Sequence, residues 1–144
     1  MSKLDAGLSV RINIKTGDYA IVNFAIDMFG MLAAWGPLVY VTKGQMEQEG
    51  LKLVIQNLEG FYERDYNANP CELNGNPSFS RKFEKQHRYV SVSLHEQRCI
   101  FFVPMHRKAR GGADSEYEDV VVLPYPCTQA QFLEALRLSE SRAT

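Results

Sequence analysis

Near the start of the chain, apolar and polar residues alternate strictly. Single polar residues separate the apolar positions Leu8, Val10, Ile12 and Ile14. A period of two is the spacing of a β-strand, in which successive side chains point to opposite faces of the sheet. We therefore expect a strand over residues 8–15, with one buried face and one polar face.

Residues 19–35 follow a different spacing. Their few polar or small positions recur at intervals of three and four residues, which is typical of a helix. Asp18 is a suitable N-cap for such a helix, and Gly36-Pro37 would end it. The segment also contains several β-branched residues, which suit a strand. We favour the helix and keep the strand as the alternative.

Two threonines mark further helix starts. Thr42 and Thr128 are each followed three residues later by a glutamine, which is the spacing of a capping box. Apolar residues recur at helical spacing from Leu51 to Tyr62, and a second amphipathic run follows Thr128. We expect a helix behind each threonine, a short buried strand at residues 38–41, and a tail that frays after Ser139.

The middle of the chain combines turn-forming residues with two strand-like runs. Residues 66–80 are rich in asparagine, proline and glycine, which predicts a long surface loop and a candidate contact surface. Behind this loop, we expect a two-residue turn at Glu96-Gln97 to join two strands in a hairpin. This register places Phe101 on a buried face and Ile100 and Phe102 on the other, half-apolar face. That second face is either covered by a helix or open for binding, so Ile100 and Phe102 are candidate partner-binding residues.

The remaining elements complete the expected fold. Residues 106–118 are mostly polar and predict a mobile loop, and residues 120–123 predict a last short strand. Together the elements predict an α+β fold in a single domain over residues 1–144. We expect a mostly antiparallel sheet of about five strands with two or three helices packed on it.

The composition is that of an ordinary globular protein. Of the 144 residues, 45% are hydrophobic and 23% are charged. The longest uncharged stretch, residues 28–42, is shorter than the roughly 20 residues that cross a bilayer, so we expect no membrane span. Cys71, Cys99 and Cys127 lack a CxxC spacing and predict free thiols, as expected for a cytoplasmic protein.

The residues that could carry chemistry do not form a recognisable motif. His87 and His95 are too far apart along one predicted strand to share a metal ion, and neither they nor His106 has ligands at metal spacing. The chain has no G-x-S-x-G elbow, and no base accompanies Cys71 in a known signature. The sequence therefore predicts no catalytic residue, no metal and no cofactor.

Charge is distributed unevenly along the chain. Residues 64–110 carry nine basic and four acidic side chains, with aromatic residues among them, as in some surfaces that bind single-stranded nucleic acid. The net charge of −1 and the isoelectric point near 6.3 argue against nucleic-acid binding. Residues 114–119 instead place four carboxylates around Tyr117. A run of charges is commonly only a solvated surface, and we keep this as the alternative. Acids around an aromatic side chain can also contact a basic protein partner, here through Asp114, Glu116, Tyr117 and Glu118.

The chain resembles the small immunity proteins that bacteria encode beside toxins of contact-dependent growth inhibition and other polymorphic toxin systems. The resemblance lies in its size, its slightly acidic charge, its single domain, and the strand and helix that end the chain. The resemblance implies a non-enzymatic inhibitor that binds and neutralises one cognate toxin domain. A second hypothesis is a secretion chaperone or adaptor that uses the Ile100/Phe102 face to form a homodimer or to accept a client strand. A third is a small enzyme that works around Cys71, His87 or His106.

Overall fold

The computed structural model describes residues 6–108 and 113–144 of the chain. Its strands are β1 (Ala6–Asn13), β2 (Tyr19–Ile26), β3 (Leu32–Val41), β4 (His87–His95), β5 (Cys99–Arg107), β6 (Ala113–Ser115) and β7 (Val121–Pro124). Its helices are α1 (Lys43–Leu58), α2 (Glu72–Gly75), α3 (Pro77–Gln86) and α4 (Gln129–Arg142), with short 3-10 turns η1 (Phe61–Glu63) and η2 (Tyr117–Asp119).

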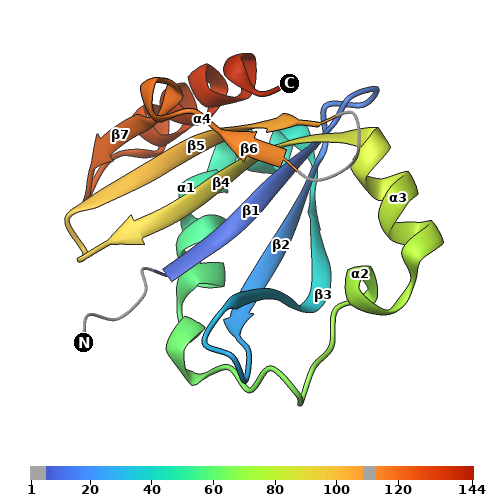
Figure 1. Ribbon diagram of the computed structural model, residues 1–144. Coiled ribbons are helices and arrows are strands. Elements are labelled where there is room, and N and C mark those ends of the chain that lie inside the picture. The colour runs from blue at the N-terminus through green and yellow to red at the C-terminus, as the bar shows by residue number, and fades with distance from the viewer. Residues whose placement is uncertain (1–5, 109–112) are drawn as a thin grey trace.

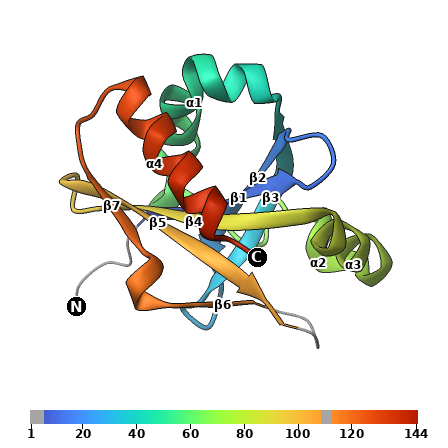
Figure 2. The same ribbon diagram turned by 90° about the horizontal axis from the view of Figure 1, so that it is seen from above.

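The strands form one antiparallel sheet in the order β3-β2-β1-β4-β5-β6, and β7 pairs with β5 on the same side as β6 (Figure 1). Helices α1 and α4 lie together on one side of the sheet (Figure 2). Helix α2 contacts the edge strand β3, and α3 contacts β4. The α+β class and the antiparallel sheet are therefore confirmed, with seven strands where the sequence predicts about five.

The expected strand at the start of the chain is confirmed as β1, but its polar face is not exposed. β1 lies in the middle of the sheet between β2 and β4. One face contributes Leu8 and Val10 to the main core. On the other face, the buried Arg11 stacks on Tyr89 at 3.7 Å and its Nη1 lies 2.6 Å from Glu84 Oε1 of α3. Arg11 is thus a buried, paired charge where the alternation predicts a solvated one.

The helix favoured for residues 19–35 is wrong, and the strand alternative holds. β2 and β3 pair antiparallel, with Phe24 opposite Ala34, and a turn joins them. Ile21 packs in the main core while Val22 packs in a second cluster beneath α3. A strand that is buried on both faces loses the alternation of apolar and polar residues, which is why its sequence does not reveal its period.

Both capping boxes are confirmed. The Thr42 and Thr128 hydroxyls each accept a hydrogen bond from the backbone N–H three residues on, and each glutamine side chain accepts one from the threonine N–H. The strand expected at residues 38–41 is the end of β3. The main core lies between the sheet and the helices, where Met46 and Val54 of α1 meet Phe132 and Leu136 of α4. No helix in the described residues is long and apolar enough to cross a membrane.

The surface loop expected at residues 66–80 is only partly present. The loop ends at α2, and α3 begins at Pro77, where the Asn76 side chain accepts a hydrogen bond from the Phe79 N–H. Asparagine followed by proline is therefore an N-cap and first helical position here, rather than a turn. Phe83 of α3 is buried against β2 in the second cluster, so α3 covers the face of the sheet opposite α1.

The β4–β5 hairpin forms as expected, but with a different register. Three residues connect the strands instead of two, since His95 pairs with Cys99, and Glu96 and Gln97 adopt φ angles of 51° and 59°. One extra turn residue moves every side chain of β5 to the opposite face. Phe102 therefore lies opposite Val92 in the core and Phe101 lies on the other face, the reverse of the prediction.

The end of the chain is ordered beyond the point where fraying is expected. α4 continues past Ser139 to Arg142, and Ala143 is buried in the main core. The Thr144 N–H then donates to the main-chain oxygen of Met105 on β5. These contacts correct the prediction that residues after Ser139 are frayed, because the sheet provides them with partners that the sequence does not reveal.

Candidate partner-binding surface

The acidic segment predicted to bind a partner forms β6 and η2. β6 pairs with the edge of β5, with Asp114 opposite His106, so this part is a strand where a loop is expected. Residues 109–112 of the expected loop lie outside the described residues, as does the side chain of Tyr117. Asp114, Glu116 and Glu118 are exposed, and Asp114 Oδ1 lies 3.1 Å from Lys108 Nζ. The segment thus presents carboxylates to solvent from an ordered backbone.

A histidine holds the acidic segment against the end of the chain. His106 Nε2 lies 2.6 Å from Asp119 Oδ2, and His106 Nδ1 lies 3.0 Å from Thr144 Oγ1. Arg142 Nη1 donates to the main-chain oxygen of Asp119 at 3.0 Å. These bonds join β5, η2 and α4, so they fix the acidic segment from two sides. We call these four residues the His106 clamp.

The clamp was not found from the sequence. The partners of His106 are Asp119 and Thr144, which lie 13 and 38 residues further along the chain. The only usable signal is the run of acidic residues that contains Asp119. The order hydroxyl, imidazole, carboxylate is also that of a hydrolase triad, so the geometry alone permits His106 to act as a base toward Thr144.

The other two residues considered for chemistry, Cys71 and His87, are buried. Burial raises the pKa of the Cys71 thiol, which disfavours the nucleophilic thiolate. Burial lowers the pKa of His87, whose ring stacks on Phe83 and whose Nδ1 bonds the Phe83 main-chain oxygen at 2.8 Å. No group of three or more histidine, cysteine or acidic side chains comes together as a metal site within the described residues.

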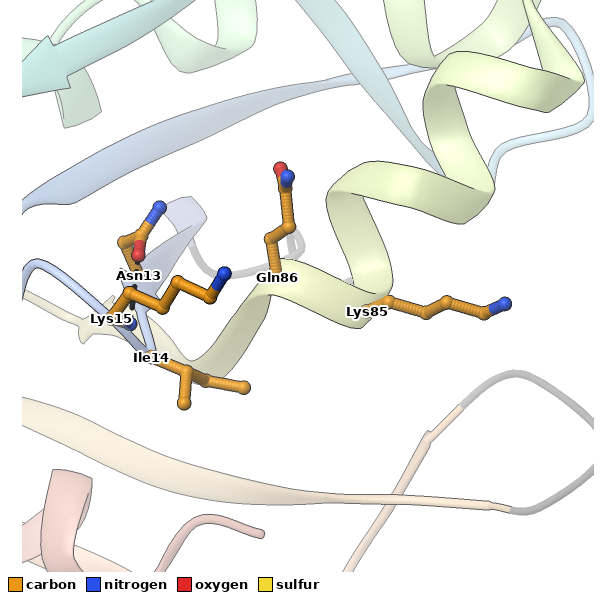
Figure 3. Close-up of a pocket in the computed structure, with 5 residues that line it drawn as sticks. All are labelled: Asn13, Ile14, Lys15, Lys85 and Gln86. Atoms are coloured by element: carbon orange, nitrogen blue, oxygen red, sulfur yellow. Dashed lines mark hydrogen bonds between the residues drawn. The ribbon is translucent and has the colours of Figure 1, made fainter.

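A small pocket lies where the end of β1 meets the end of α3. Asn13, Ile14, Lys15, Lys85 and Gln86 line it, and its volume is about 170 Å³ (Figure 3). The Ile14 N–H donates to the main-chain oxygen of Gln86 at 2.9 Å. The side chain of Lys85 points away from the other four residues, so the two ammonium groups do not converge on one anion (Figure 3). The pocket is also smaller than the roughly 300 Å³ of typical ligand sites.

Ile100 and Phe102 do not form a contact surface. Both side chains are fully buried in the main core, and Phe102 packs on Phe132 of α4 with ring centroids 5.6 Å apart. The prediction that they bind a partner is wrong because it depends on the two-residue turn. The chaperone hypothesis was based on an exposed Ile100/Phe102 face, and the structure does not have that face.

An apolar surface exists elsewhere, at the turn between β2 and β3. The side chains of Met28, Phe29, Met31 and Leu32 are all largely exposed there. The helix predicted for residues 19–35 leaves no place for a turn, so this surface was not predicted. A usable signal was present, since Asp27 and Gly30 suit a turn between two β-branched or aromatic runs. We call these four residues the apolar tip.

No protein-family model matches the chain, and no curated protein matches it. Several solved chains share its fold, including the following two. One is a protein of unknown function from Neisseria meningitidis, with a TM-score of 0.66, 15% identity, and coverage of 100% of this chain and 98% of that one. The other is a chain of a CdiA-CT/CdiI toxin and immunity complex from Yersinia pseudotuberculosis, with a TM-score of 0.66, 11% identity and 98% coverage of both chains.

At these identities the likeness concerns the fold alone. It extends over nearly all of each chain, so the whole arrangement of sheet and helices is shared, not a common hairpin or helix pair. One of the two neighbours is a chain from the structure of a toxin and immunity complex.

Proposed function

We propose that this chain is an immunity protein that binds a cognate bacterial toxin domain and neutralises it without catalysis. The observation that carries the proposal is the likeness of its fold, over nearly its full length, to a chain of a toxin and immunity complex. The resemblance in size, charge and build that the sequence suggests points to the same class. Fold alone does not fix function, so the proposal also needs a surface suited to a protein partner.

The acidic segment supplies one such surface. The His106 clamp fixes the chain at Asp119, next to the exposed carboxylates of Asp114, Glu116 and Glu118. A cluster of like charge attracts a basic partner over a long range. Many toxins that act on nucleic acid have basic clefts, because they must bind phosphates. An acidic surface on an inhibitor would therefore speed its association with such a cleft.

A growth assay tests the function. The toxin domain encoded beside this gene, expressed alone in a bacterial host, is expected to stop growth, and coexpression of this chain is expected to restore it. The chain expressed alone is expected to be harmless. Failure to restore growth, together with no complex between the two purified proteins, would contradict the proposal.

The same assay separates inhibition from catalysis. Thr144→Val keeps the shape of the side chain and removes the hydroxyl that His106 contacts, so an enzyme that uses this hydroxyl would lose its activity. We expect Thr144→Val still to protect, because Asp119 keeps its bonds to His106 and Arg142 and binding needs no nucleophile. Loss of protection by a folded variant that still binds the toxin would show that protection is chemical.

Replacing Asp114, Glu116 and Glu118 by serine tests the acidic segment. We expect the fold to remain, because exposed charges contribute little to stability. The association rate with the toxin domain should fall by about tenfold or more at low salt and should lose most of its salt dependence. Stopped-flow measurements at low and high ionic strength would check this. An unchanged rate and salt dependence would remove the segment from the interface.

A further inference from the structure

The β2–β3 hairpin carries the most exposed apolar side chains of the described structure. The exposed fractions of Met28, Phe29, Met31 and Leu32 are 76%, 79%, 65% and 47%. Scattered apolar residues are normal on a protein surface, but four large ones within five positions form a patch. Their exposure means that they contribute little burial to the folding of this chain, so folding does not explain their presence.

The turn that carries these residues is tightly bonded. Asp27 Oδ1 accepts hydrogen bonds from the N–H groups of Phe29 at 2.9 Å and Met31 at 3.0 Å. The Asp27 N–H donates to the main-chain oxygen of Met31, and Gly30, at a φ of +79°, donates to that of Asp27. The carboxylate of Asp27 is therefore used inside the turn, and the side chains on either side of it are presented from a fixed backbone.

The base of the hairpin is braced as well. Buried Asn23 of β2 donates from Nδ2 to Asn57 Oδ1 of α1 at 2.9 Å. Arg64 donates to the main-chain oxygen of Phe24 at 2.8 Å and lies over the ring of Trp35 at 4.9 Å. These contacts tie both strands of the hairpin to α1 and to the segment behind it. A rigid projection loses little conformational entropy when it binds, which favours affinity.

The chemistry of the hairpin indicates its partner. Residues 19–41 contain a single charged residue, Asp27, and its carboxylate bonds the turn. The hairpin therefore offers apolar side chains with no basic residue in its own sequence, whereas segments that dip into a membrane surface usually add lysine or arginine for the lipid headgroups. Phenylalanine and methionine are instead enriched at the centres of protein interfaces.

We propose that the apolar tip inserts into an apolar pocket of the toxin domain and provides most of the binding energy. This inference rests on the proposed function. The acidic segment would then set the association rate through long-range charge, and the buried tip would set the dissociation rate. Figure 2 shows β6 and the β2–β3 turn on the side of the sheet away from α1 and α4, and Figure 1 shows them near opposite ends of the molecule, so a partner that contacts both has to span the sheet.

The test is the double variant Phe29→Ser, Met31→Ser, measured against the purified toxin domain by surface plasmon resonance. We expect Kd to rise by about 100-fold or more, almost entirely through faster dissociation, with the salt dependence of association unchanged. The melting temperature should not fall, because both side chains are exposed. The matched control is Tyr40→Ala, an aromatic side chain that is 66% exposed at the far end of the same hairpin, and its Kd should stay within about twofold of the unchanged chain.

The outcomes separate the two proposals. If the unchanged chain forms no complex with the toxin domain, the proposed function fails and the tip surface fails with it. If the unchanged chain binds and the double variant binds equally well, only the tip surface is overturned. Sedimentation of the free chain and flotation with vesicles of anionic lipid provide the last check. A dimer or a membrane association that the double variant abolishes would assign the tip to that occupant and overturn the proposal.

Discussion

Replacing Phe102 by alanine is expected to lower the free energy of unfolding by about 3–5 kcal/mol. Phe102 is 0% exposed on β5 and packs against Phe132 of α4, so the substitution removes the contact that joins the sheet to this helix. Nearby side chains belong to several different elements and cannot all move into the space. The loss therefore includes a residual cavity as well as the lost burial of the ring.

Phe101→Ala is the matched control, because the two phenylalanines are adjacent on one strand. Phe101 lies on the face of β5 away from the main core and is half-buried, with its ring stacked on His95 at 5.2 Å. We expect this variant to lose less than about half as much stability as Phe102→Ala, in proportion to its smaller burial. Denaturant melts of both variants decide the register. A larger loss for Phe101→Ala would mean that the two-residue turn is correct.

Gly50→Val is expected to cost about 2–3 kcal/mol by overpacking the contact between α1 and α4. A Cβ atom at Gly50 would lie 2.6 Å from Met46 Sδ and 3.1 Å from Phe132 Cε1. The thioether of Met46 is flexible in principle, but Met46 is fully buried and has no free space to enter. A glycine inside a helix normally costs stability, so its presence here reflects the close approach of the two helices.

Gly44→Val makes the same change in the first turn of the same helix. Nothing lies within 4 Å of a Cβ atom built there, so only helix propensity changes. We expect the stability of this variant to equal or slightly exceed that of the unchanged chain. Calorimetry of the two variants side by side isolates the packing effect. Equal melting temperatures would show that α1 and α4 can move apart at little cost.

Local chemistry made several elements predictable. The capping boxes at Thr42 and Thr128 depend on side chains three residues apart, so they need no information from the rest of the chain. The strand at Leu8 and the hairpin around Glu96 also follow from short patterns. The α+β class then follows from the order of these elements. The position of the acidic segment on the surface was predictable for the same reason, since its charges are adjacent in sequence.

The candidate surfaces required distant residues to come together, and here the sequence was misleading. The acidic segment is fixed by the contact of His106 with Asp119 and Thr144, which no spacing in the chain reveals. The apolar tip was hidden because residues 19–35 show helical spacing while forming two strands. Ile100 and Phe102 were assigned to a surface because the sequence predicts a two-residue turn. Glu96 and Gln97 adopt positive φ angles, which are unusual outside glycine, and the turn is one residue longer than predicted.

The sequence by itself determined where helices begin, which runs favour strands, and the class of fold that they build. The tertiary structure alone decided which faces are buried, because burial depends on what packs from the other side. It placed α3 over Arg11, put Phe102 rather than Phe101 in the core, and left the apolar tip without a cover. Helix starts and hairpin turns depend on interactions over three or four residues, whereas burial and binding surfaces reflect contacts among residues tens of positions apart.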